Sequence, residues 1–326
     1  MSEKNEKTCP PCAKMTSIGG QALIEGIMMR GPKRSAMAVR NPEGEIVLET
    51  WDTPANNRPK FFKLPFVRGL FNFIDSMKSG YRCLMRSAEI AMPEDFEEEN
   101  GQKKEKTEAD KKKDNLLVSV AVTIGAVLGV LLSVGLFVWL PSQLYALLSG
   151  AVPALDNRFL RSVFEGLFRI ALFVGYVSLM CLMKDIRRTF EYHGAEHKTI
   201  FCYEAGLPLT VENIRPMKRF HPRCGTSFMI LMLLVGIVIG MLIPVTNPLL
   251  RTLIKLALLP VTVGIGYELL KLCGRHDNKL TRLIAAPGMW LQHITVHEPD
   301  DSMIECAIAA MNVAIPTPEE AESDKW

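Results

Sequence analysis

The stretch Thr226–Val245, TSFMILMLLVGIVIGMLIPV, decides the fold class because it runs for 20 residues without a charged side chain. A helix of that length crosses the hydrocarbon core of a bilayer, which is about 30 Å thick. The run Leu116–Leu140 is uncharged over 25 residues and meets the same condition. The sequence therefore predicts a transmembrane helix at each of these two segments.

Two further apolar runs carry a few charged side chains towards their ends. Phe159–Met183 contains Glu165 and Arg169, and Thr252–Leu272 contains Lys255 and Glu268. We expect both to cross the membrane, with a buried helix of a soluble protein as the alternative for Thr252–Leu272. The expected fold is an α-helical polytopic membrane protein with about four transmembrane helices, a small α+β cytosolic N-terminal region and a cytosolic loop that holds the candidate site.

Basic residues predict the orientation, since lysine and arginine gather in cytoplasmic loops. Six lysines lie within 103–113 and eight basic residues within 184–223, whereas the loop 141–162 contains only Arg158 and Arg161. Both termini and all six histidines are therefore expected on the cytoplasmic side. The eight cysteines would then lie in a reducing compartment, where structural disulfides are not expected.

The segments outside the apolar runs comprise predicted structured regions and polar linkers or tails. The turn Asn41-Pro42-Glu43-Gly44 between two strand-like runs predicts a β-hairpin, and a basic amphipathic helix follows, either on the inner leaflet or packed on a cytosolic domain. The expected regions are a disordered tail (1–14), a hairpin-containing cytosolic region (15–60), the amphipathic helix (65–90), a charged linker (91–115), a four-span membrane domain (116–272) with a cytosolic loop (184–225), a cytosolic C-terminal segment (273–315) and a tail (316–326).

Two motifs near the N-terminus are interpreted as structural features rather than as binding sites. Cys9 and Cys12 have the spacing of half a zinc knuckle or of a redox pair, but without a second pair they are interpreted as reduced thiols in the tail. The glycine-rich segment Gly19–Pro32 lacks the Lys-Ser/Thr ending of a phosphate-binding loop and is interpreted as tight backbone turns. The net charge of +3 gives no reason to expect a nucleic acid partner, so the lipid bilayer is the expected one.

The pentapeptide His193-Gly194-Ala195-Glu196-His197 is the strongest chemical signal in the chain. Two imidazoles four residues apart lie on one face of a helix, the spacing with which zinc sites are built, and a carboxylate beside them can serve as general base. His221 and Cys224 precede the next apolar run and return to the same side of the membrane. We therefore predict His193, His197, His221 and Cys224 as zinc ligands, or ligands of another divalent transition metal, and Glu196 as the catalytic base.

This ligand set leaves a choice open. Four protein ligands fill a tetrahedral shell and indicate structural zinc, whereas three leave a position for chemistry. A third interpretation needs no metal, because the histidine pair and Glu196 could instead cap a helix and pair with Arg187, Arg188 or Arg223.

At these residues the chain resembles the YqhQ-like family, bacterial integral membrane proteins of unknown function that have been described as predicted metal-dependent enzymes. The resemblance covers most of the chain and implies a place in the bacterial inner membrane. It also implies that His276, His293 and His297 are not ligands, since the family pattern carries other residues there. The matching motifs are Gly19-Gly20-Gln21, Glu25 to Arg30, Phe66 to Gly69, Glu191 to Lys198, His221 to Thr226, Ala286 to Gly288 and Glu298 to Asp301.

Three functions follow as hypotheses. The first is a metal-dependent hydrolase that acts on a membrane-associated substrate, with Glu25, Arg30 and Glu298 as further candidates for its pocket. The second is a membrane scaffold or assembly factor with a structural zinc site and a protein partner. The third is a transporter, for which the spans offer few polar groups at mid-depth.

Overall fold

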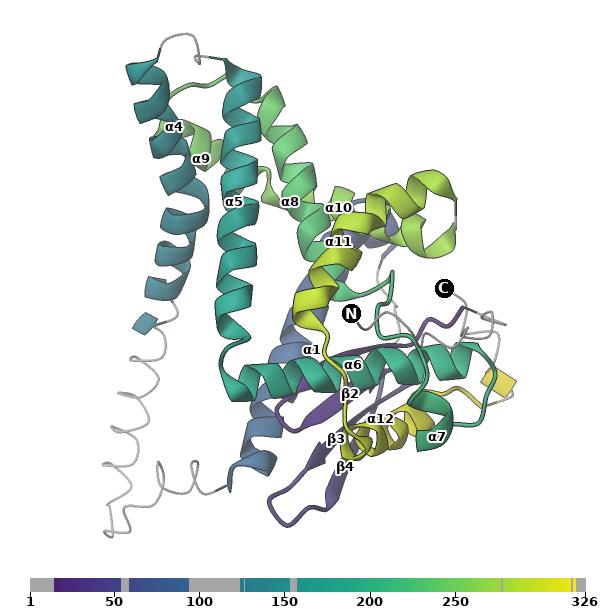
Figure 1. Ribbon diagram of the computed structural model, residues 1–326. Coiled ribbons are helices and arrows are strands. Elements are labelled where there is room, and N and C mark those ends of the chain that lie inside the picture. The colour runs from purple at the N-terminus through teal and green to yellow at the C-terminus, as the bar shows by residue number, and fades with distance from the viewer. Residues whose placement is uncertain are drawn as a thin grey trace, which may run out of the picture. The chain divides into compact units, whose positions relative to one another are not determined.

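A computed structural model describes residues 15–53, 59–93, 124–125, 127–152, 157–276, 278–317 and 319–320. Within them the chain is mostly helical, with a small antiparallel sheet near the N-terminus (Figure 1). It divides into two compact units: the first combines Met1–Pro93, Tyr176–Leu231 and Val263–Trp326, and the second Glu94–Gly175 and Met232–Thr262. The predicted tail 1–14 with Cys9 and Cys12, and most of the linker 91–115 and the tail 316–326, lie outside the described residues.

The sheet of the first unit has four antiparallel strands in the order β1-β2-β3-β4. They are β1 (Gly19–Leu23), β2 (Gly26–Arg30), β3 (Arg34–Arg40) and β4 (Ile46–Asp52). The predicted hairpin is present as β3 and β4 around residues 41–44. Gly44 has a φ of 88°, which a residue without a Cβ adopts at little cost. The segment Gly19–Pro32, interpreted as tight turns, instead forms β1 and β2.

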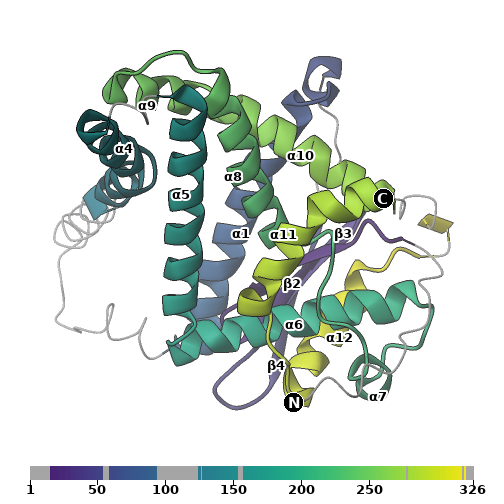
Figure 2. The same cartoon turned by 45° about the horizontal axis from the view of Figure 1, so that its top comes forward.

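The two central strands, β2 and β3, are buried on both faces, and alternate residues of each strand face opposite sides. On one face β2 and β3 pack against α12 (Asp301–Ala314), and β1 and β2 pack against α6 (Lys184–Glu204). On the other face Met28 and Met37 pack with Cys83 of α1 (Val67–Ala91). Figures 1 and 2 show α6 and α12 on one side of the strands and α1 on the other. The amphipathic helix predicted near residues 65–90 therefore packs on the sheet.

The expected cytosolic loop 184–225 is largely helical, with α6 followed by α7 (Val211–Ile214). Helix α6 is crossed closely by the segment that joins α11 (Lys279–Thr295) to α12, where the backbone N–H of His297 donates to the oxygen of Phe190 at 2.9 Å. A Cβ at Gly194 would lie 1.9 Å from the His297 oxygen. Only a glycine at position 194 allows this approach.

Several helices are long and apolar enough to cross a membrane. They are the helix Val127–Ala151, α5 (Arg158–Met180) and α8 (Gly225–Leu242). A fourth candidate is the pair α9 (Pro248–Ala257) and α10 (Leu259–Arg275), whose axes differ by 51°. Length and composition are thus those of a membrane protein with three or four spans.

The first span differs from the prediction. Residues 116–123 and 126 lie outside the described residues, and the described helix continues past Leu140 to Ala151, so the expected loop 141–162 is shorter. Pro141 lies in the first turn of α4 (Leu140–Ala151), directly after the π-helix η2 (Gly135–Trp139). Because residues 127–151 form one continuous helix, the N–H that Pro141 lacks leaves a carbonyl of the preceding turn without its helical partner. The Nε of Arg169 donates to the carbonyl of Phe137, four residues before Pro141, at 2.6 Å. The proline therefore does not end the apolar helix.

The fourth predicted span, Thr252–Leu272, is broken rather than continuous. Helix α9 ends at Ala257 and α10 begins at Leu259, just before Pro260. Proline removes a backbone donor and its ring crowds the preceding turn, which is a common cause of sharp kinks. The break is consistent with either a bent span or a re-entrant segment.

Substitution of Gly194 tests the close crossing of α6. We expect Gly194→Ala to lower stability by about 1–3 kcal/mol through overpacking against the His297 carbonyl, although alanine favours helix over glycine by about 1 kcal/mol. Thermal unfolding of the purified protein in detergent measures this. Gly175→Ala in α5, where a Cβ meets nothing within 4 Å, is the control and should unfold at the wild-type temperature or above. Equal unfolding temperatures for the two variants would contradict the packing described.

Candidate metal centre

Helix α6 supplies three polar side chains from two adjacent turns. His193 and His197 lie four residues apart, with ring centroids 4.4 Å apart, and Glu196 lies beside them. His197 is 1% exposed and Glu196 6%, so the group is largely withdrawn from water. The opposite face of the helix packs Tyr192 and Ala195 into the core, and this fixes the rotation of the polar face.

Cys224 completes a group of three possible ligands. It lies at the end of the segment before α8, and its Sγ is 3.2 Å from Nε2 of His193. One ligand atom from each of His193, His197 and Cys224 lies within 4.8 Å of the other two. Two imidazole nitrogens and a thiolate sulfur at this separation match the donor set that zinc prefers.

The outer nitrogen of each histidine is fixed by a backbone carbonyl. Nδ1 of His193 is 2.9 Å from the oxygen of Thr295, and Nδ1 of His197 is 2.5 Å from the oxygen of Arg219. A carbonyl oxygen only accepts, so each Nδ1 carries the proton and each Nε2 keeps its lone pair. Metal-binding histidines are commonly oriented in this way by a second hydrogen bond.

The protonation preferences of these residues suit metal ligands. Burial lowers the pKa of His197 and so favours the neutral imidazole. Burial alone would raise the pKa of Cys224, but the charge and hydrogen bond of His197, together with hydrogen bonds from Thr226, outweigh it and lower the pKa. These two shifts apply one at a time, because His197 lowers the pKa of Cys224 only when its own imidazole is protonated. The hydrogen bonds from Thr226 favour the thiolate beside a neutral imidazole, which is the pair that a metal binds.

Among the described residues, none of the three arginines that the sequence suggested as partners forms an ion pair with Glu196. Arg187, Arg188 and Arg223 pair with Glu191, Glu25 and Glu204 respectively. The carboxylate of Glu196 instead accepts a hydrogen bond from the backbone N–H of Gly20 in β1.

The environment of Glu196 favours its protonated form more than water does. Burial raises the pKa of Glu196 to about 7, and the charge of Cys224 adds to this, although His193 and the Gly20 N–H oppose it. A Cβ at Gly20 would lie 2.8 Å from Cγ of Glu196, so a larger residue there would displace the carboxylate. A carboxyl group with a pKa near 7 can both take and give a proton.

His221, the fourth predicted ligand, faces another way. Its ring lies 5.5 Å from that of His197, but its Nδ1 accepts from the backbone N–H of Arg223 at 3.3 Å. Its Nε2 is 3.3 Å from Nη2 of Arg223 and 3.9 Å from Oε2 of Glu204. The structure therefore groups three of the four predicted ligands and directs His221 towards Glu204 and Arg223.

Gln292 holds the backbone of His221 in place. This fully buried side chain of α11 accepts from the N–H of His221 and donates to its carbonyl, both at 2.8 Å, and also donates to Ser227 at 3.0 Å. The sequence analysis did not single out Gln292, because an uncharged glutamine within a helix carries no signal and lies 71 residues from its partner.

The three further pocket candidates have separate surroundings. Glu25 lies at the turn between β1 and β2, where Arg188 and Tyr192 hold its carboxylate. Glu298 pairs with the buried Lys198. Arg30 has no ion pair with any described residue and lines a pocket of about 410 Å³.

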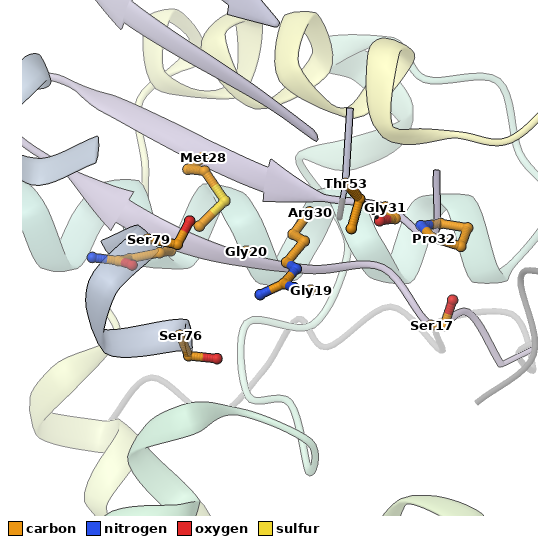
Figure 3. Close-up of a pocket in the computed structure, with 11 residues that line it drawn as sticks. Ser17, Gly19, Gly20, Met28, Arg30, Gly31, Pro32, Thr53, Ser76 and Ser79 are labelled. Atoms are coloured by element: carbon orange, nitrogen blue, oxygen red, sulfur yellow. Dashed lines mark hydrogen bonds between the residues drawn. The ribbon is translucent and has the colours of Figure 1, made fainter. Parts of the chain in front are cut away.

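That pocket is built largely from the glycine-rich segment. Figure 3 shows the side chain of Arg30 reaching past β1 beside Gly19, with Ser76 and Ser79 of α1 on one side and Ser17 on the other. Gly20 lines the pocket and also donates its N–H to Glu196. The pocket and the candidate metal centre therefore share this residue.

A larger pocket of about 840 Å³ is lined by His221. Its lining is mainly apolar, with Phe201, Phe220, Met289 and Trp290, and the buried pair of Glu204 and Arg223 lies at its wall. The pocket is also lined by His276 and His293, which the group of three possible ligands does not include.

Comparison with known proteins gives a family but no activity. The family described as "Protein of unknown function (DUF1385)" matches residues 64–317. The "Uncharacterized protein YqhQ" of Bacillus subtilis (strain 168) is 36% identical over 301 residues, which cover 91% of each chain. No solved structure matches the chain.

Replacement of Gln292 tests how the segment with His221 and Cys224 is held. Gln292→Leu keeps the size of the side chain but leaves the N–H and carbonyl of His221 buried without partners, so stability should fall by about 2–4 kcal/mol. Thermal unfolding in detergent measures the loss, and Gln292→Glu, which retains only the acceptor, should fall between wild type and Gln292→Leu. Wild-type stability of Gln292→Leu would show that water replaces these hydrogen bonds.

Proposed function

The chain belongs to the DUF1385 family of proteins of unknown function, and we propose that it is a metal-dependent hydrolase with zinc held by His193, His197 and Cys224. The number of converging ligands carries the proposal. Three grouped protein ligands leave the fourth tetrahedral position for a substrate or water, as in catalytic zinc sites, whereas structural sites use four. The direction of His221 away from the group therefore favours chemistry.

The residues present fit such a metal, because two nitrogen donors and one sulfur donor converge with their outer atoms already fixed. When bound, a divalent metal supplies a Lewis acid. Glu196 takes the proton from the attacking water and returns it to the leaving group, so that one bond of the substrate is exchanged for one bond to water. The Gly20 N–H holds the Glu196 carboxylate in place for both transfers.

The pocket beside Gly20 suits the substrate. The guanidinium of Arg30 is available there for a negatively charged part of the substrate, and the serine hydroxyls of Ser76 and Ser79 offer hydrogen bonds. The rival proposal is a scaffold in which a buried zinc site stabilises the first unit, and the low exposure of His197 and Glu196 favours it.

We also propose that the protein is a multi-pass protein of the bacterial inner membrane with both termini in the cytoplasm. The support is the distribution of basic residues, which are frequent over 184–223 and few between the first two apolar helices. This orientation needs an even number of spans, so α9 and α10 would together form the fourth. The metal centre would then face the cytoplasm, and its substrate would be membrane-associated.

Metal content distinguishes three ligands from four. Protein purified from zinc-containing medium should carry roughly one zinc per chain by elemental analysis. His193→Ala, His197→Ala and Cys224→Ser should lose most of it, whereas His221→Ala and the matched control His293→Ala should retain it. Loss of zinc from His221→Ala, with the other hydrogen bonds of its segment preserved, would restore the four-ligand site and remove the argument for catalysis.

Glu196→Gln distinguishes the hydrolase from the scaffold. The amide oxygen still accepts from Gly20, so fold and zinc content should stay as in wild type, but without a proton acceptor hydrolysis should fall by about 100-fold or more. The assay follows cleavage of a panel of membrane-soluble carboxylic and phosphate esters by mass spectrometry. If Glu196→Gln cleaves as fast as wild type, Glu196 is not the base, and if neither protein cleaves while Cys224→Ser unfolds, the scaffold is the better proposal.

A further inference from the structure

The pocket of about 840 Å³ is not used by the proposed metal centre, since none of the three proposed ligands lines it. Its volume lies within the range of about 300–1,000 Å³ that is typical of pockets enclosing a small organic ligand. All the residues that line it belong to the first unit. The pocket can therefore hold a ligand of its own.

The interior of this pocket is apolar, and the charges in its wall are paired. Phe201, Phe220 and Met289 supply much of the lining. Of the described residues that line it, Glu204 is the only carboxylate, and it pairs with Arg223, with the two side chains 3% and 7% exposed. A ligand inside would meet apolar side chains and a neutralised ion pair, which suits a hydrocarbon chain better than a polar molecule.

Helix α11 forms most of the mouth of the pocket. The exposed residues of the lining are mostly on this helix, namely Arg282, Ala286, Trp290 and His293. Their spacing of three or four residues places them on one side of the helix. A ligand would therefore enter the pocket alongside α11.

Beside this mouth, α11 carries an apolar stripe formed by Leu280, Leu283, Pro287 and Trp290. Leu280, Leu283 and Trp290 are 63%, 70% and 57% exposed, and the helical spacing of the stripe gives it one face. Trp290 belongs both to the stripe and to the mouth. The exposed apolar surface is thus continuous with the entrance of the pocket, and a surface of this kind marks contact with a membrane or another protein.

The place of α11 in the chain favours a membrane as that contact. Helix α10, the second half of the bent candidate span, ends at Arg275, and α11 begins only four residues later, at Lys279. The segment 271–282 contains four basic residues and one acidic residue. Basic residues beside a membrane span attract anionic headgroups, and tryptophan is enriched at the membrane surface. Helix α11 thus has the features of an amphipathic helix that lies in the membrane surface.

We infer that the pocket binds one acyl chain of an anionic phospholipid, which enters from the membrane past Trp290. The chain occupies the apolar interior lined by Phe201, Phe220 and Met289, and the phosphate stays at the mouth with Arg282. The inference rests on the proposed membrane location. It does not rest on the proposed metal chemistry, because no proposed metal ligand lines the pocket.

Photolabelling of the full-length protein tests this site. The protein is placed in nanodiscs of phosphatidylcholine with a small fraction of phosphatidylglycerol that carries a diazirine at the end of one acyl chain, and mass spectrometry locates the labelled residues after irradiation. Labels should appear on Phe201, Phe220 or Met289 as well as on the apolar helices α5 and α8. Ala285→Phe narrows the pocket from α11, so it should lower the labelling of the pocket residues by roughly tenfold and leave that of α5 and α8 unchanged.

The headgroup is tested by a second pair of variants in the same nanodiscs. Arg282→Gln should lower labelling of the pocket by about fivefold, which corresponds to one basic residue near an anionic headgroup. Arg82→Gln is the matched control and should be labelled as wild type, because Arg82 is also an exposed arginine of a helix but does not line the pocket. A phosphatidylcholine that carries the same diazirine chain should label the pocket less than the phosphatidylglycerol does.

The labelling of the apolar helices separates this inference from the membrane location. Labels on α5 and α8 but none in the pocket overturn the inference and leave the membrane location intact, whereas labels on neither overturn both. Equal labelling of the pocket by the phosphatidylcholine analogue, or labelling only by a diazirine fatty acid, overturns an anionic phospholipid as the occupant. If Ala285→Phe fails to fold, Ala286→Phe obstructs the mouth at an exposed position and should lower the labelling in the same way.

Discussion

Close packing between helix α6 and strand β1 is the contact on which the candidate metal centre depends. Gly20 has no side chain, and therefore the carboxylate of Glu196 can reach its backbone N–H. On the same helix Gly194 allows the segment at His297 to cross within hydrogen-bonding distance of the backbone. These two contacts fix the position and rotation of α6. In that position His193 and His197 lie beside Cys224.

The features that the sequence predicted correctly are local. Uncharged runs indicated the apolar helices, and a turn of Asn, Pro and Gly indicated the hairpin of β3 and β4. The spacing of His193 and His197 placed them on one helical face because helical geometry alone decides that. Each of these inferences depends on residues a few positions apart.

The features that the sequence did not predict depend on contacts between distant segments. His221 is three residues from Cys224, yet its ring faces Glu204. The backbone N–H of Arg223 donates to the ring, and Gln292 forms hydrogen bonds with the backbone of His221. The carbonyls of Thr295 and Arg219 that orient the histidines belong to the backbone, so the residue types at these positions do not indicate their role. The end of the first apolar helix was misplaced because Pro141 follows a π-helix, which sequence patterns do not show.

The two buried glutamates of α6 differ in their partners, and the difference separates a structural carboxylate from one that can exchange a proton. Glu204 accepts from the backbone N–H of Thr16 and pairs with Arg223, and although burial opposes it, these partners together with His221 lower its pKa. Among the described residues, the Gly20 N–H and His193 favour the charged form of Glu196, two turns away, but they do not outweigh burial, and its pKa is raised. The same residue type on the same helix thus has opposite shifts, set by its partners rather than by burial. A carboxylate held by cations stabilises the fold, whereas one held by a single N–H remains able to exchange a proton.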